Sequence, residues 1–359
     1  MITISLCMIV KNEQDIIEQC LDSVKNCVDE IIIVDTGSTD NTVELIKKYT
    51  DKVFFFDWID DFSAARNYSF SKATKDYILW LDADDVLMPE DQIKLMALRT
   101  SLSDFIDSVT MTYNYGFDEF GNPTLSFRRN RLVKRNRMFK WYGPVHEYLS
   151  VSGNIINSDV TVSHKRIHQK SGRNLSIFEK RLKNGENFSA RDTYYYANEL
   201  SDNGFLEKAI EYYDIFLNMN DGWIEDKIST CYKVANKYLN LGDLEKELEY
   251  IWKSFELTTP RAEFCCMLGY HFLNKKEYKK ALFWYKLASD LEKPKENWGF
   301  FLDSCWTWLP HLQLCLCYYW LGDYKNSYEQ NEAARSFRPM DDRILHNKKL
   351  LEGILNDDK

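Results

Sequence analysis

Short apolar runs alternate with helix-like stretches over the first half of the chain. Four of these runs read as buried strands, namely residues 2–10, 30–35, 52–56 and 77–81. Between them, apolar residues recur at three- and four-residue spacing, as in residues 16–24, which is typical of an amphipathic helix. Strands that alternate with helices predict an α/β fold with a doubly wound parallel sheet.

Carboxylates follow two of these predicted strands. Asp35 ends one run, and Asp82, Asp84 and Asp85 follow another. Since such sheets bind ligands at the carboxyl ends of their strands, we expect these side chains to face one crevice. Carboxylate oxygens are hard ligands that suit Mg²⁺ or Mn²⁺, and a metal held in this way can bridge to substrate phosphates. The alternative is an acidic turn before a helix that starts at Pro89.

From about residue 190 the pattern changes to helical spacing with few strand signals. One template, opening on a glycine or a lysine, recurs at residues 204–210, 242–248, 276–282 and 322–328. Pro260 and Pro294 lie 34 residues apart, which is the tetratricopeptide period. In three units a small residue, Ala209, Ala281 or Ser327, lets the second helix pack closely. The sequence therefore predicts an all-α solenoid of the tetratricopeptide type after the α/β domain.

Composition narrows the class of protein. A net charge of −9 and a pI of about 5.4 argue against a nucleic-acid partner. Nine cysteines without a CxxC pair favour buried, reduced thiols and a cytoplasmic location. The apolar N-terminal run lacks a basic flank and stops at Lys11, so we expect neither a signal peptide nor an integral membrane segment.

Four short blocks occur in a characteristic order along the first half. They are Lys11-Asn-Glu13, Asp35-Thr-Gly-Ser-Thr-Asp40, Phe62-Ser-Ala-Ala-Arg-Asn67 and Trp80-Leu-Asp-Ala-Asp-Asp85. Their order and spacing over about residues 1–185 resemble the family 2 glycosyltransferases. The resemblance implies an inverting enzyme with the GT-A nucleotide-diphospho-sugar fold, a UDP-sugar donor, and Mn²⁺ or Mg²⁺ as cofactor.

The resemblance also implies a role for each matched residue. Ile9, Lys11 and Glu13 would border the base, Asp35 would accept a hydrogen bond from uracil, Arg66 would flank base and diphosphate, Asp82 would lie by the ribose, and Asp84 would bind the metal. From the residues alone, Arg66 has two interpretations, a salt bridge to Asp60 or Asp61 and a contact with the nucleotide.

The pair His146-Glu147 lies where this family places its catalytic carboxylate. Many members carry Glu-Asp there, and the departure resembles a subset with lipopolysaccharide-type glucosyltransferases and bacteriocin-type peptide glycosyltransferases. Inversion by a single displacement needs a base near the acceptor. We expect Glu147 to be that base and His146 to orient it or to bind sugar; a purely structural role for the pair is the alternative.

Residues 159–164 alternate like a strand that ends on His164. Folds of this type complete the metal site with a C-terminal histidine, so the resemblance implies His164 as a ligand, with His168 in reserve. Lys165 and Arg173 belong to a basic segment that resembles a lid over the donor diphosphate, with a simple linker as the alternative. The expected domains are a transferase domain at 1–170, a lid or linker helix at 171–188 and the repeats at 189–359.

A second basic segment covers residues 128–137. Such a run is usually a solvated basic face. The functional alternative is that some of these residues contact the sugar diphosphate or an anionic acceptor.

The tryptophans of the repeats exceed the needs of a solenoid core; they include Trp284, Trp298, Trp306, Trp308 and Trp320. We therefore expect an exposed aromatic groove that binds a polypeptide or mediates a homodimer, and a structural cap is the alternative.

Together these features predict a metal-dependent transferase that moves a hexose, glucose or N-acetylglucosamine, from a UDP-sugar. The acceptor would be a Cys or Ser/Thr of a peptide or protein held by the repeats, because transferase domains fused to such repeats resemble bacteriocin (glycocin) enzymes. The alternatives are a cell-envelope glycan or lipid-linked acceptor, and a non-catalytic nucleotide-binding scaffold.

Overall fold

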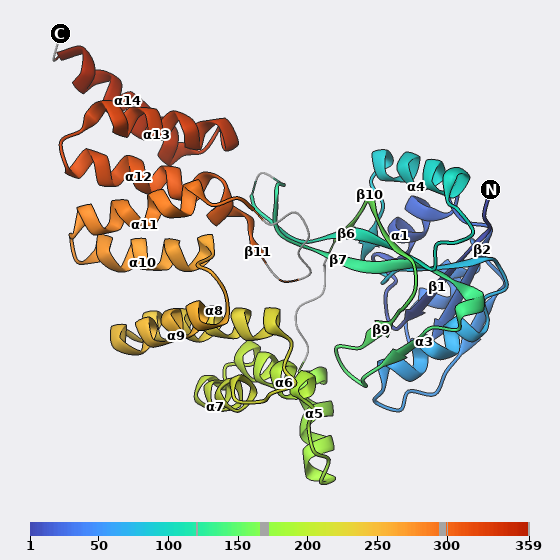
Figure 1. The fold of residues 1–359 in the computed structure, drawn as a ribbon. Coiled ribbons are helices and arrows are strands. Elements are labelled where there is room, and N and C mark those ends of the chain that lie inside the picture. The colour runs from blue at the N-terminus through green and yellow to red at the C-terminus, as the bar shows by residue number, and fades with distance from the viewer. Residues whose placement is uncertain (120, 166–171, 294–298, 300, 358–359) are drawn as a thin grey trace. The chain divides into compact units, whose positions relative to one another are not determined.

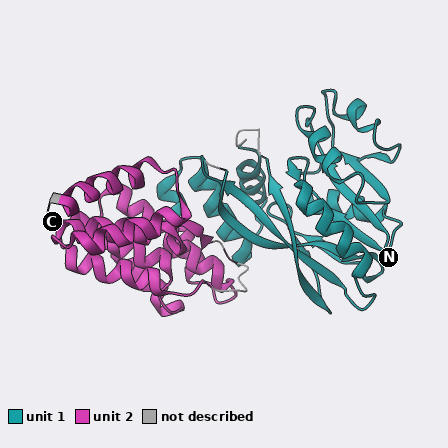
Figure 2. Ribbon diagram, turned by 90° about the horizontal axis from the view of Figure 1, so that it is seen from above, with its two compact units in different colours: residues 1–209 teal, residues 210–359 magenta. Residues whose placement is uncertain are grey.

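The computed structural model covers 359 residues and describes all of them except 120, 166–171, 294–298, 300 and 358–359. The chain forms two compact units, residues 1–209 and residues 210–359 (Figure 2). The first unit is built on a mixed sheet, and the second is helical (Figure 1). The expected order, an α/β domain followed by an all-α region, is confirmed.

The sheet of the first unit has the strand order β3-β2-β1-β4-β7-β6-β10-β5. Its strands are β1 (Ile4–Val10), β2 (Glu30–Asp35), β3 (Val53–Phe55), β4 (Tyr77–Trp80), β5 (Asp85–Val86), β6 (Ser108–Phe117), β7 (Pro123–Lys134) and β10 (Ile155–His164). Strands β1 to β4 pair in parallel, whereas β7 runs antiparallel to both β4 and β6. A separate hairpin pairs β8 (Lys140–Tyr142) with β9 (Tyr148–Ser150).

Helices cover both faces of this sheet because the central strands are apolar on both sides. The first unit contains α1 (Ile17–Val24), α2 (Thr42–Ile46), α3 (Phe62–Ser71), α4 (Pro89–Ser101), α5 (Arg173–Lys183) and α6 (Ala190–Asp202). On one face, Leu6 and Met8 of β1 share a buried cluster with residues of α1 and α4. On the other, Cys7 joins a cluster that packs against Phe70 of α3. The expected doubly wound arrangement is therefore present, but the sheet is mixed and not purely parallel, because β7 and β5 pair antiparallel with their neighbours.

Asp61 fixes the start of helix α3. It is the N-cap, and its carboxylate accepts a hydrogen bond from the amide of Ala64 at 3.0 Å. Ser63 lies inside the first turn and donates its own hydroxyl to Asp61 at 2.7 Å. The cap fixes where α3 starts, and therefore where Arg66 points.

The carboxyl ends of β2 and β4 lie at one edge of the sheet, because both strands pair in parallel with β1. Asp35 is the last residue of β2, and Asp82 follows β4 by two residues. The topology thus brings together side chains that are far apart in the sequence.

The opposite end of β2 carries a buried carboxylate that stabilises the fold. Glu30 accepts hydrogen bonds from Ser5, from Lys52 and, at 2.9 Å each, from the amide and hydroxyl of Thr74. Burial alone would raise the pKa of Glu30, but these donors outweigh it and lower the pKa from 4.5 to about 2.

Because the pKa is lower in the folded state, Glu30 stabilises the fold at pH values above its ordinary, unfolded-state pKa. This stabilisation is lost as the pH falls through the folded-state pKa. Glu30→Gln is therefore expected to cost about 2 kcal/mol of unfolding free energy at pH 7, and the deficit should shrink between pH 4.5 and about 2. Urea unfolding at several pH values measures this. Glu18→Gln, whose partner Lys48 is exposed, is the control and should cost under about 0.5 kcal/mol. A deficit that does not vary with pH would contradict the assignment.

The second unit consists of antiparallel helix pairs. Its helices are α8 (Ile224–Leu241), α9 (Leu244–Leu257), α10 (Ala262–Asn274), α11 (Tyr278–Asp290), α12 (Trp308–Trp320), α13 (Tyr324–Phe337) and α14 (Asp342–Asp357), after α7 (Leu206–Leu217), which spans the boundary. A two-residue strand, β11, covers Phe301–Leu302. Short 3-10 turns lie at Arg135–Arg137 and Asp303–Trp306. None of the helices in the described ranges has the length and apolar character needed to cross a bilayer.

The repeat template predicts the turns correctly. Gly204, Gly242, Lys276 and Gly322 all have positive φ, at 87°, 79°, 59° and 78°. Lysine pays a conformational cost there that glycine does not. The small residues Ala281 and Ser327 are fully buried, as expected.

One repeat departs from the small-residue pattern. Glu247 takes the corresponding place in α9, is fully buried, and lies with one carboxylate oxygen 3.0 Å from Nδ1 of His271. The contact joins the second helix of one pair to the first helix of the next.

The tryptophans of the repeats are only partly available for binding. Trp284, Trp306 and Trp308 pack against buried clusters, and Trp298 lies outside the described residues. Trp320 is exposed, and so are aromatic residues that the sequence did not single out, among them Trp252 and Phe283. Three of the five tryptophans thus contribute to the packing of the helices, and the exposed aromatic groove stays a prediction.

Candidate active site

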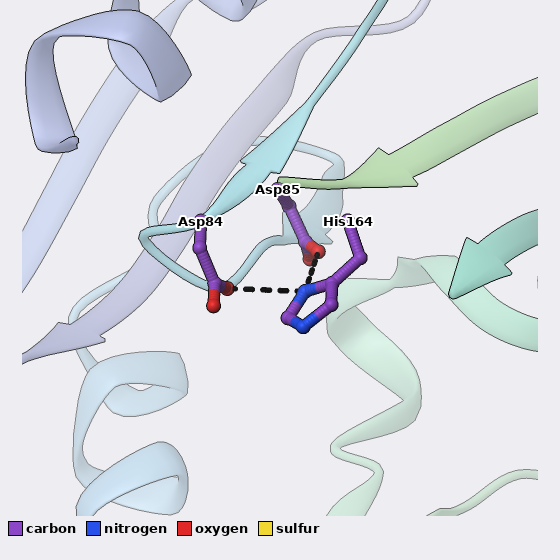
Figure 3. Close-up of side chains that lie close together, drawn as sticks. All are labelled: Asp84, Asp85 and His164. Atoms are coloured by element: carbon purple, nitrogen blue, oxygen red, sulfur yellow. Dashed lines mark ion pairs between the residues drawn. The ribbon is translucent and has the colours of Figure 1, made fainter. Parts of the chain in front are cut away.

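Three ligand-type side chains meet at the carboxyl edge of the sheet. Strand β5 pairs antiparallel with β10, and the register places His164 directly opposite Asp85. His164 Nδ1 lies 3.4 Å from Asp84 Oδ1 and 3.8 Å from Asp85 Oδ1 (Figure 3). One donor atom from each of the three side chains lies within 4.8 Å of the others. The predicted ligands Asp84 and His164 are thus adjacent, and Asp85 joins them.

His164 is held firmly in this cluster. Its ring stacks on Tyr115 with centroids 4.8 Å apart and an interplanar angle of 8°, and the Tyr113 hydroxyl lies 2.9 Å from Nδ1. Burial would lower the pKa of His164, but the carboxylates of Asp84 and Asp85 outweigh burial and raise it to about 9. A divalent cation would replace that proton as the positive charge between the carboxylates.

The donor set fits Mn²⁺ or Mg²⁺. Two carboxylates and one imidazole are hard or borderline ligands, which such ions accept. Asp85 Oδ1 is buried and accepts no hydrogen bond from the described residues, which leaves it available to a cation. His168, the reserve ligand, lies outside the described residues.

Arg66 connects the carboxylate cluster to the predicted base. Its Nη2 donates to Asp82 Oδ1 at 2.6 Å, and its Nε donates to Glu147 Oε1 at 2.5 Å. The guanidinium also lies over Trp80 and Trp141, at 5.0 and 4.8 Å from the ring centroids. Burial opposes the charged form of Asp82, but Arg66 and then Arg131 outweigh it and lower the Asp82 pKa. The ion-pair partners of Arg66 are therefore Asp82 and Glu147, and not Asp60 or Asp61 as considered from the sequence.

The hairpin between β8 and β9 carries His146 and Glu147. His146 has a φ of 51°, and its Nε2 lies 2.8 Å from Glu199 of α6. Its ring stacks on Tyr195 at 4.2 Å, and its carbonyl accepts hydrogen bonds from Arg191. The backbone strain is therefore offset by three contacts from one helix. His146 points toward α6, whereas Glu147 points toward Arg66.

The residues expected around the nucleotide lie at the same edge. Ile9 is half-buried near the end of β1, Lys11 is exposed just beyond it, and Glu13 follows with its amide donating to Thr42 at 2.7 Å. Asp35 is buried, and its carboxylate accepts hydrogen bonds from the amides of residues 37 and 38. These bonds hold the turn after β2 and fix the orientation of Asp35.

The two predicted lid cations, Lys165 and Arg173, lie on either side of residues 166–171, which are outside the described residues. The amide of Lys165 donates to the Asp84 carbonyl at 2.7 Å, and its ammonium lies 4.9 Å from the Phe117 ring centroid. Arg173 opens α5 and lies over Phe62 at 4.7 Å. Burial lowers the pKa of Arg173, and the charges of Glu13 and Glu147 oppose this change. Arg173 is therefore within electrostatic reach of the predicted base.

The basic run on β7 is not a solvated face throughout. Arg131 is fully buried and pairs with Asp85 at 2.9 Å, and Arg129 lies over Tyr113 at 4.9 Å. Arg128, on the other face of the strand, donates to backbone carbonyls of neighbouring strands. The sequence analysis placed Asp85 in the acidic cluster without naming it as a metal ligand, and it gave Arg131 no individual role. The alternation of arginines at positions 129 and 131 was the available signal, because residues two apart share a strand face.

Comparison with known proteins agrees with this geometry. Residues 5–160 match the model of the glycosyl transferase family 2. The TPR repeat-containing protein Synpcc7942_0270 of Synechococcus elongatus is 39% identical over 152 residues, which are 42% of this chain and 36% of that protein. The SPbeta prophage-derived glycosyltransferase SunS of Bacillus subtilis is 31% identical over 261 residues, which are 67% of this chain and 61% of SunS.

The chain thus spans less than two thirds of the length of these two curated relatives. The solved structure of S. aureus TarS 1-349 with UDP-GlcNAc is similar at 15% identity and a TM-score of 0.38, covering 71% of this chain and 91% of that one. The sequence match and the arrangement of the sheet agree: residues 5–160 match the glycosyl transferase family 2 model, and a series of helix pairs follows this region.

Proposed function

We propose that this chain is a metal-dependent inverting glycosyltransferase that moves glucose or N-acetylglucosamine from a UDP-sugar to a peptide or protein side chain. The observation that carries the proposal is the cluster of Asp84, Asp85 and His164 beside the Arg66-bridged pair of Asp82 and Glu147. A family 2 domain with this cluster has separate groups for a leaving diphosphate and for an incoming nucleophile.

The cluster suits the leaving-group side of the reaction. Asp84, Asp85 and His164 would hold Mn²⁺ or Mg²⁺, which supplies charge neutralisation for the departing nucleoside diphosphate. Lys165 and Arg173 add positive charge from the lid segment. Ile9, Lys11, Glu13, Asp35 and Asp82 would bind the uridine, with Arg66 between the base and the diphosphate.

Glu147 suits the nucleophile side. In a single displacement the acceptor oxygen or sulfur forms a bond to the anomeric carbon while the bond to the diphosphate breaks with its electron pair. The acceptor proton passes to Glu147, whose carboxylate is oriented by its hydrogen bond from Arg66. His146, held by Glu199, keeps the hairpin in the conformation that presents Glu147.

The acceptor class rests on the repeats and on the family subset that the His-Glu pair resembles. A peptide with a Cys or Ser/Thr acceptor would lie along the repeats, where Trp252, Phe283 and Trp320 are exposed. A homodimer through the same region belongs to the proposal. A thiol acceptor would depend less on Glu147 as a base, because a fraction of the thiol groups is already ionised near neutral pH.

The test is release of UDP from a panel of UDP-sugars, with Mn²⁺, with Mg²⁺ or with EDTA, in the absence of any acceptor. We expect slow turnover of one sugar with metal and none with EDTA, and addition of Mn²⁺ in excess should restore it. Turnover that EDTA leaves unchanged would contradict the metal requirement. Cleavage only in the presence of a lipid-linked acceptor would contradict the peptide acceptor.

A further inference from the structure

Arg131 is a fully buried charge near the candidate active site. Its side chain and that of Asp85 are both 0% exposed. The guanidinium lies over Trp80 and Tyr113, 3.9 and 4.5 Å from the ring centroids. Burying an arginine so completely is costly unless its charge is compensated, and Asp85 compensates it.

The two oxygens of Asp85 have different surroundings. Oδ2 lies 2.9 Å from Arg131 Nη1 and accepts a hydrogen bond from the amide of Asp82 at 3.0 Å. Oδ1 accepts no hydrogen bond from the described residues and faces His164 at 3.8 Å (Figure 3). One oxygen is therefore held in place, and the other points into the cluster.

Arg131 is itself fixed at a second point. Its Nη1 also donates to the backbone carbonyl of Trp80 at 3.2 Å. Trp80 is the last residue of β4. The Arg131 guanidinium therefore connects the end of this strand to the carboxylate of Asp85. Rotation of Asp85 would break contacts to both Arg131 and Asp82.

We propose that Arg131 is a positioning residue that holds Asp85 Oδ2 so that Oδ1 serves as a metal ligand beside Asp84 and His164. The inference rests on the proposed function, because it assigns a role within the same metal site. Residues that orient metal ligands commonly change metal affinity by 10- to 100-fold when they are removed.

The sign of the effect separates positioning from simple charge. Arg131→Met removes a positive charge near a cation site, which by Coulomb's law alone would strengthen metal binding. Loss of positioning has the opposite effect, so we expect the Kd for Mn²⁺ to rise about 10- to 100-fold. Arg129→Met is the matched control, because Arg129 lies on the same face of β7 but makes no ion pair with Asp85. It should leave Mn²⁺ affinity unchanged or increase it.

The experiment measures Mn²⁺ binding to the full chain by electron paramagnetic resonance of the free ion, without nucleotide. Arg131→Lys keeps the charge but not the planar fork, and should fall between wild type and Arg131→Met. The double variant Asp85→Asn/Arg131→Met should bind Mn²⁺ at least as tightly as Asp85→Asn, because Arg131 would position only Asp85 and its charge opposes the cation. The double variant also removes both members of the buried pair, which protects folding if Arg131→Met alone is unstable.

The outcomes distinguish the two proposals. Mn²⁺ binding by Arg131→Met that equals or exceeds wild type would overturn the positioning role and leave the transferase proposal standing. A further loss of affinity when Arg131→Met is added to Asp85→Asn would also overturn it. Wild-type protein that binds no Mn²⁺ would instead overturn the metal site on which both depend.

Discussion

Glu147→Gln is expected to lower the turnover number by about 10²- to 10⁴-fold with an alcohol acceptor, because the amide cannot take the proton of the nucleophile. The Michaelis constant for the donor should change little, since Glu147 is proposed to act on the acceptor and not on the donor. Steady-state kinetics with a peptide acceptor measure both constants. With a thiol acceptor the loss should be smaller, because the thiolate forms without the base. The ratio of the two losses therefore reports on the acceptor.

A matched control for this variant is Glu186→Gln. Glu186 also accepts a hydrogen bond from an arginine Nε, that of Arg181, at 2.8 Å, but it is exposed and outside the candidate site. It should retain wild-type rates. Glu147→Gln leaves Arg66 paired with Asp82, so the fold should persist, and thermal unfolding checks this. A wild-type rate for Glu147→Gln would rule it out as the base.

Asp84→Asn is expected to lower metal-dependent turnover by about 10³-fold, which corresponds to several kcal/mol of charge stabilisation in the transition state. An amide is a weaker ligand than a carboxylate and adds no negative charge to balance the cation. Titration of UDP release with Mn²⁺ measures the effect, and the Mn²⁺ concentration for half-maximal rate should rise. Asp51→Asn, at an exposed turn, is the control and should behave as wild type. An unchanged Mn²⁺ response in Asp84→Asn would remove Asp84 from the metal site.

Much of the fold follows from local patterns. Mostly apolar runs identify β1, β2 and β4 because strands buried on both faces leave few polar positions. The repeat turns follow from glycine, whose freedom at positive φ suits a sharp reversal between helices. Lys276 occupies the same turn, and it was found only through its alignment with the glycines.

The site was harder to predict than the fold where it depends on pairing between distant segments. Asp85 faces His164 only because β5, two residues long, pairs with the end of β10. No periodicity is visible in two residues. Arg131 was hidden for another reason: a run of cations is normally solvated, and its burial depends on a partner, Asp85, that lies 46 residues away in the sequence.

The position of α6 has a consequence for protein engineering. Three side chains of α6 contact His146, namely Arg191, Tyr195 and Glu199. The first compact unit continues beyond this helix to residue 209. A chimera that grafts foreign repeats at the composition change near residue 189 would discard all three, and the strained hairpin would relax. A junction within residues 218–223, between α7 and α8, keeps the native grip. Recognition modules should therefore be exchanged after the second helix of this region, so that the parent chain retains its own α6.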